Sequence, residues 1–114
     1  MPIALNVEML AHCYDMIAAT PVMARLNLPP SEDIKFHIIK KRDRFAHHQV
    51  KNGVHQIAIS SRFVGSFMTL VMTMCHEMIH VHQHEAKLPR DDGKGFQKMA
   101  DKICKQLEFD RLIF

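Results

Sequence analysis

The chain has 114 residues, 47% apolar and 24% charged, a composition that fits one globular domain with little room for a second. Its formal net charge of +3 permits contact with nucleic acid without requiring it. No stretch reaches the roughly 20 apolar residues of a membrane-spanning helix, and Glu8, His12 and Asp15 interrupt an N-terminus that is not typical of a signal peptide.

The cysteines, Cys13, Cys75 and Cys104, are odd in number and have no CxxC spacing. This pattern argues against a disulfide scaffold and against a cysteine-based zinc ribbon. We therefore expect a cytoplasmic protein, in which each cysteine is a small core residue.

The first predicted element is a helix over "ALNVEMLAHCYDMIAA", which ends near Pro21 and is followed by the linker "RLNLPPSED". A half-buried strand is predicted over residues 34–39, where Ile34, Phe36 and Ile38 alternate with their neighbours. The dipeptide Asn52-Gly53 then predicts a tight hairpin turn between arms at residues 45–51 and 54–60. Three successive strands suggest a three-stranded antiparallel meander.

Two helices are predicted after the strands. One covers about residues 63–86, with Ser60 or Ser61 as its cap, and the other covers about residues 95–108. The chain is thus expected to form an α+β fold: an N-terminal helix, a small sheet and two further helices.

The stretch "TMCHEMIHVHQHEAK" (residues 73–87) contains the pattern HExxH, formed by His76, Glu77 and His80. On a helix, residues four apart lie about 40° apart around the axis and about 6 Å apart along it, so both histidines can bind one ion. Zinc accepts imidazole nitrogen readily, and Glu77 is placed to act as a general base toward a bound water. His82 and His84 lie too far round or along the helix, and we expect them to be bystanders.

This helix supplies no third metal ligand. We expect the third ligand to come from the segment that folds back after the helix ends. The candidates are Asp91, Asp92, Asp101 and Glu108.

"HEMIHV…DGKGFQKMADKI" resembles the SprT-like (Spartan-type) zinc metalloprotease family, over most of residues 34–107. Gly93 and Phe96 match the glycine and the aromatic residue of that family's pattern. The position of the family's third histidine is occupied by Asp92, which is a legitimate zinc ligand, although Asp92 can equally cap the last helix or form an Asp-Gly turn.

The resemblance implies a single zincin-like domain over residues 1–114, with His76, His80 and Asp92 as metal ligands and Glu77 as the catalytic base. It implies a Zn²⁺ site, with Mn²⁺ or another divalent ion as alternatives, and a protein or peptide substrate. The substrate would pair with a sheet edge, for which "VHQIAIS" (residues 54–60) is the candidate. Tyr14, His47, His48 and His55 are candidates for stabilising the oxyanion.

The family also implies proteolysis of DNA-associated or DNA-crosslinked proteins. The basic stretch "KKRDRFAHHQVK" (residues 40–51) is the candidate for weak, non-specific contact with phosphates, and the affinity of such contact should fall as the salt concentration rises. The alternative is that this stretch is only a solvated strand edge. Two alternatives stay open. In the first, the chain is a catalytically degenerate SprT-like binding module that acts through its basic face or a protein partner. In the second, it is a hydrolase of a non-protein amide.

Overall fold

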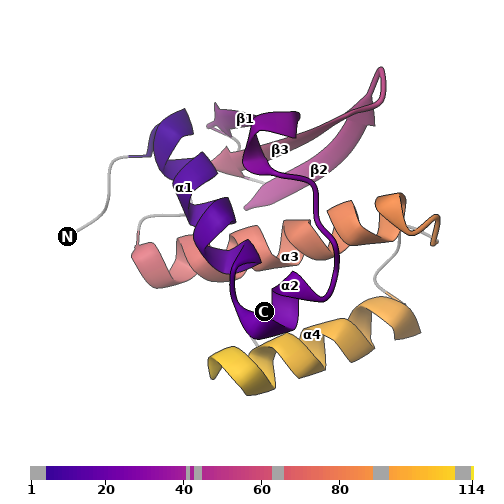
Figure 1. The fold of residues 1–114 in the computed structure, drawn as a ribbon. Coiled ribbons are helices and arrows are strands. Elements are labelled where there is room, and N and C mark those ends of the chain that lie inside the picture. Colours follow the sequence, from indigo (N-terminus) through magenta and orange to yellow (C-terminus); the bar gives the residue numbers. More distant parts are fainter. Residues whose placement is uncertain (1–4, 41, 43–44, 63–65, 89–92, 110–113) are drawn as a thin grey trace.

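A computed structural model of the chain contains the expected first helix, three strands and two further helices in that order, and it adds a short helix and a 3-10 turn, neither of them predicted, between the first helix and the strands (Figure 1). The structure describes residues 5–40, 42, 45–62, 66–88, 93–109 and 114. The elements are α1 (Val7–Ala18), α2 (Pro21–Ala24), a 3-10 turn η1 (Ser31–Asp33), β1 (Ile34–Ile39), β2 (Ala46–Lys51), β3 (Val54–Ser60), α3 (Phe67–Glu85) and α4 (Lys94–Leu107). The α+β class is therefore confirmed, and within the described residues no helix combines the length and apolar character needed to cross a bilayer.

The sheet is mixed, and the predicted antiparallel meander is wrong. Its strand order is β1-β3-β2, with β3 parallel to β1 and antiparallel to β2. The chain therefore leaves β1, crosses the end of β3 to the opposite edge, and returns through the hairpin to the centre.

Burial explains why β3 occupies the centre. From Ile57 to Ser60 every residue of β3 is buried, whereas β1 and β2 each keep several exposed or half-buried positions. A strand covered on both faces is typically an almost continuous apolar run, and "IAI" is such a run. The expectation that residues 54–60 form a free sheet edge is wrong for the same reason, because β3 pairs on both sides.

The hairpin turn between β2 and β3 is confirmed. Asn52 and Gly53 have φ angles of 53° and 77°, the left-handed conformation that a two-residue turn of this kind requires at both positions. The turn fixes the register so that Gln49 lies opposite Gln56.

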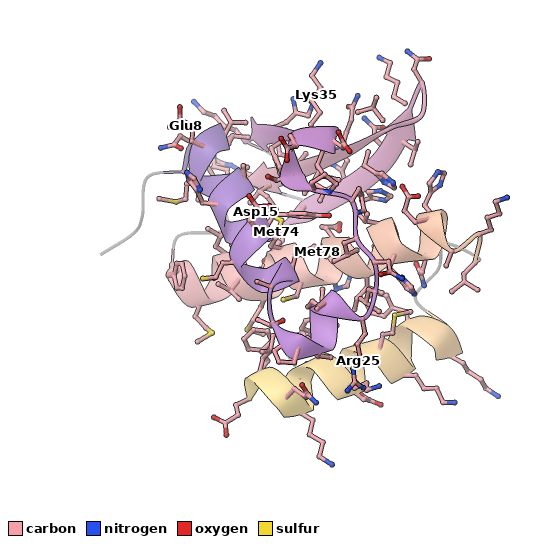
Figure 2. All side chains as sticks on the ribbon, viewed as in Figure 1. Glu8, Asp15, Arg25, Lys35, Met74 and Met78 are labelled. Carbon is pink, nitrogen blue, oxygen red and sulfur yellow. The ribbon has the colours of Figure 1, made fainter. Side chains whose placement is uncertain are left out.

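Helix α3 lies between the sheet and α4, which runs alongside it in the opposite direction (Figure 1). The apolar side chains of α3 point into the core from several faces of this helix. Met74 and Met78 of α3 are fully buried there, while charged residues such as Lys35 and Arg25 extend from the periphery (Figure 2). Because the core surrounds α3, the side chains of this helix are held in a defined position.

The cap of α3 is Ser66, and the predicted caps Ser60 and Ser61 are wrong. The Ser66 hydroxyl accepts a hydrogen bond from the Thr69 amide, and the helix begins at Phe67. Ser60 is instead fully buried at the end of β3, where its hydroxyl accepts from the Arg62 amide.

Candidate metal centre

Three side chains of α3 converge at the middle of the helix. One ligand atom from each of His76, Glu77 and His80 lies within 4.8 Å of the others. Glu77 and His80 are buried, with exposed fractions of 5% and 7%, and His76 is half-buried. Among the residues that the structure describes, this is the one group of three or more His, Cys, Asp or Glu side chains with such spacing.

A hydrogen bond that His80 donates to Gln83 sets the orientation of His80. The His80 Nδ1 and the Gln83 Oε1 are 2.8 Å apart, and Gln83 is almost completely buried. An amide oxygen only accepts hydrogen bonds, so Nδ1 of a neutral His80 carries the proton. The lone pair then resides on Nε2, the nitrogen that a metal would bind.

His76 is oriented in the same way, by a backbone carbonyl. The His76 Nδ1 donates to the Phe114 oxygen at 3.2 Å. Both histidines are therefore in the Nδ1-protonated form, and both offer Nε2. Histidine ligands of zinc commonly donate their second nitrogen to a carbonyl or carboxylate in this way, so the residues present fit a zinc ion.

Phe96 of α4 holds the two imidazoles from the side opposite the sheet. Its ring centroid lies 4.7 Å from that of His76 and 5.1 Å from that of His80, nearly parallel to the latter. Phe96 itself is 3% exposed. The aromatic residue that matched the family pattern in the sequence thus packs directly on both candidate ligands.

A pocket of about 380 Å³ opens beside His76 and Glu77. Its other walls come from the start of β2, from α3 and from Phe114. The lining residues are Phe45, Ala46, Thr69, Met72, Thr73, His76, Glu77 and Phe114. A ligand in this pocket would therefore lie next to the candidate base.

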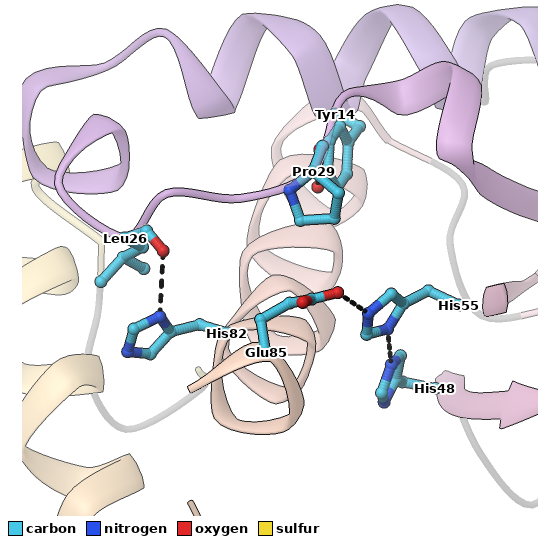
Figure 3. Close-up of polar contacts among 7 residues, drawn as sticks. All are labelled: Tyr14, Leu26, Pro29, His48, His55, His82 and Glu85. Carbon is cyan, nitrogen blue, oxygen red and sulfur yellow. Dashed lines mark hydrogen bonds and ion pairs between the residues drawn. The ribbon is translucent and has the colours of Figure 1, made fainter. Parts of the chain in front are cut away.

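A second buried polar network begins on the sheet and ends at the same helix (Figure 3). The His48 Nε2 lies 2.8 Å from the His55 Nδ1, and the His55 Nε2 donates to the Glu85 carboxylate at 2.7 Å. Both histidines are buried, at 1% and 3% exposure. The His48 ring also stacks on His80, with centroids 6.4 Å apart, so the network contacts the candidate metal centre.

None of the four predicted oxyanion stabilisers lines the pocket beside Glu77. His48 and His55 belong to the buried network, and His47 points to the opposite face of β2 from His48. The Tyr14 hydroxyl donates to the Pro29 carbonyl at 2.6 Å inside the core, and burial, with smaller contributions from Asp15 and Glu85, raises the pKa of Tyr14.

His82 and His84 lie outside the metal-capable group, in agreement with the sequence analysis. The His82 Nδ1 donates to the Leu26 carbonyl at 3.1 Å, which ties the end of α3 to the segment after α2 (Figure 3). His84 is exposed and packs edge-on against His55.

Of the four residues predicted as possible third metal ligands, the structure describes two. Asp92, like Asp91, lies outside the described residues. Asp101 and Glu108 are exposed on and just after α4, and neither belongs to the group around His76.

The basic stretch 40–51 contributes to the sheet. Its second half is β2, an edge strand, and His48 in it is buried. Lys40, Arg42 and Lys51 are exposed and lie in the part of the stretch that the structure describes.

The sequence did not lead us to predict two contacts of the candidate metal centre, those of Gln83 and Phe114 with the two histidines. Gln83 lies three residues after His80, a spacing that puts both on one side of a helix, so this signal was available. The contact of His76 with the Phe114 carbonyl joins positions 38 apart, and a backbone group carries no signal in the sequence.

Comparison with known proteins adds no relative to this picture: no family model, no curated protein and no solved structure matches the chain.

Proposed function

We propose that the chain is a zinc-dependent metallopeptidase of the SprT-like type. The observation that carries this proposal is the convergence of His76, Glu77 and His80 within 4.8 Å, with the Nδ1 atoms of both histidines already engaged as donors. A pair of histidines oriented in this way, with a buried carboxylate between them, is the arrangement that metal-assisted hydrolysis requires.

In this proposal His76 and His80 hold the ion through Nε2, and Asp92 supplies the third ligand. Catalytic zinc sites generally have three protein ligands and keep one position for water. A carboxylate ligand also suits harder ions, so Mn²⁺ is an alternative to Zn²⁺. When bound, the ion lowers the pKa of its water and polarises the scissile carbonyl.

Glu77 transfers the proton. Its carboxylate accepts a proton from the attacking water and then delivers it to the nitrogen of the leaving amine. Its burial, at 5% exposure, keeps competing solvent away from this step.

The substrate in this proposal is an extended peptide that pairs with β2. Within the described part of the chain, β2 has a strand partner on one side only, and its first residue, Ala46, lines the pocket beside Glu77. Contact with DNA, and hence a choice of DNA-associated proteins as substrates, would come from the basic residues around Lys40 and Arg42.

Replacing Glu77 by Gln tests the proposal. The zinc-loaded protein is expected to cleave an unfolded protein substrate such as casein, and E77Q is expected to lose at least about a hundredfold in rate because a general base typically contributes this much. Zinc content, measured by atomic emission, should stay the same in both proteins.

The alternative, a catalytically degenerate binding module, gives the opposite result. It predicts no cleavage by the unsubstituted protein with Zn²⁺, Mn²⁺ or any other divalent ion. Zinc binding that survives replacement of both His76 and His80 by Ala would contradict the proposed metal site itself.

A further inference from the structure

The side chains that line the pocket beside Glu77 indicate what kind of group can bind there, which the proposed peptidase activity does not specify. Apart from His76 and Glu77, none of its lining residues has an ionisable side chain. Four of the remaining lining residues are apolar, namely Phe45, Ala46, Met72 and Phe114, and the other two are threonines. Phe45 is half-exposed at the rim, so the apolar lining extends to the surface.

The position of the pocket relative to β2 determines which group of a ligand would enter it. Alternate side chains of a strand lie on one face of a sheet, and Ala46 and His48 both lie on the face toward α3. A peptide paired with the outer edge of β2 would direct its own alternate side chains to that same face. One of those side chains, opposite the start of β2, then points into the pocket next to Glu77.

An aromatic side chain of the chain itself packs against His76 at the wall of this pocket. The Phe114 ring lies against His76, with centroids 5.7 Å apart, and its carbonyl oxygen accepts a hydrogen bond from the same histidine. An apolar side chain thus already packs within one ring width of the candidate metal ligand, at the wall of the pocket.

From these observations we infer that the pocket selects the substrate: it binds a large apolar side chain, of the Phe, Leu or Met class, on a residue that flanks the scissile bond. The inference rests on the proposed peptidase function. A pocket of about 380 Å³ has room for such a side chain and the adjoining backbone. A carboxylate side chain would be excluded, because it would lose its hydration among apolar groups and approach the Glu77 carboxylate.

The test uses the intact chain loaded with zinc and two pools of extended peptides. In one pool Phe is moved through every position of a Gly/Ser/Thr background, and in the other pool Asp takes its place. Binding is measured by fluorescence anisotropy on E77Q, and cleavage is measured on the unsubstituted protein. We expect the best Phe peptide to bind about tenfold tighter than its Asp counterpart and to be cleaved beside the Phe.

Met72→Ala removes part of the pocket wall and should reduce this preference severalfold. Met68→Ala is the matched control, since Met68 lies one turn earlier on the same helix, is 59% exposed and does not line the pocket. Its preference should equal that of the unsubstituted protein.

The outcomes separate the two ideas. Equal binding of the Phe and Asp peptides, or cleavage at positions unrelated to Phe, overturns the pocket inference and leaves the peptidase proposal standing. Preferential binding of Phe peptides without cleavage by the zinc-loaded protein supports the pocket and overturns the peptidase proposal. A preference that Met68→Ala reduces as much as Met72→Ala also overturns the pocket inference.

Discussion

At the scale of single residues, the spacing of the HExxH motif was enough to predict most of the candidate site. His76 and His80 are one turn apart, and helix geometry alone predicted that they meet. What spacing could not supply is the protonation of each ring, since this depends on the group that faces Nδ1. For His80 that group is the side chain of Gln83, and for His76 it is a carbonyl from the far end of the chain.

The role of Gln83 as a positioning residue leads to a prediction for metal affinity. Gln83→Leu removes the acceptor from the His80 Nδ1–H while keeping most of the buried volume, and we expect zinc affinity to fall by about 10- to 100-fold. Gln83→Glu retains an acceptor oxygen and should keep most of the affinity. Competition with a chromogenic chelator measures both.

Gln106→Leu provides the control, because Gln106 is an exposed glutamine on α4. Its zinc affinity should equal that of the unsubstituted chain. An unchanged affinity in Gln83→Leu would mean that the amide does not orient His80.

At the scale of elements, the strands and helices were predictable and the pairing of the strands was not. The turn residues Asn52 and Gly53 identified the hairpin locally. The parallel partnership of β1 and β3 depends on which strand can be buried on both faces, a property of the whole packing arrangement. The apolar run in β3 carried this signal, but local alternation in the neighbouring strands favoured a meander.

The pairing of His48 with His55 links the two strands of the hairpin and gives a prediction for stability. Replacing either histidine by Leu leaves a buried nitrogen of the other without its partner, so each single substitution should cost about 1–3 kcal/mol in the free energy of unfolding. The double substitution should cost clearly less than the sum, since no orphaned group remains between the strands. Urea denaturation of the metal-free protein measures all four members of the cycle.

The pair Gln49 and Gln56 is the matched control on the same two strands. These side chains lie directly opposite each other and hydrogen-bond at 3.2 Å at the surface, where Gln49 is exposed and Gln56 is half-buried. Their replacement by Leu should change the unfolding free energy by no more than about 0.5 kcal/mol. Additive costs in the His48 and His55 cycle would show that the two histidines do not act as a pair.

At the scale of the whole molecule, the core determines the behaviour of its ionisable groups. Cys13, Cys75 and Cys104 are all buried, as the sequence analysis expected of small core residues. Burial raises the pKa of the Cys13 thiol from 9.0 to about 11, and it raises the pKa of Cys75 as well, with smaller effects of the two neighbouring thiols. The folded chain therefore keeps these protons at a pH where the unfolded chain has lost them.

The consequence is a loss of stability in alkali. Below pH 9 the Cys13 thiol is protonated in both states and stability does not depend on it. Between pH 9 and 11 the unfolded state binds fewer protons than the folded state, so the free energy of unfolding falls as pH rises, by about 2 kcal/mol for this one group.

Chemical denaturation at pH 8 and pH 11 measures this effect. Cys13→Ala is less stable at pH 8 because it removes buried atoms, but it should lose less stability between the two pH values than the unsubstituted protein. An equal loss in both proteins would show that the Cys13 thiol does not contribute to the pH dependence.

The central position of β3 also sets the order in which the sheet can be assembled. Two turn residues join β3 to β2, whereas fourteen residues, 40–53, separate it from its parallel partner β1, and closing the longer loop costs more chain entropy. We expect the hairpin to form first and β1 to dock last. Until β1 docks, β3, the most buried strand of the folded molecule, has one open edge, so the nascent chain is most prone to aggregate at this stage. Pulsed hydrogen exchange that protects β1 before β2 would contradict this order.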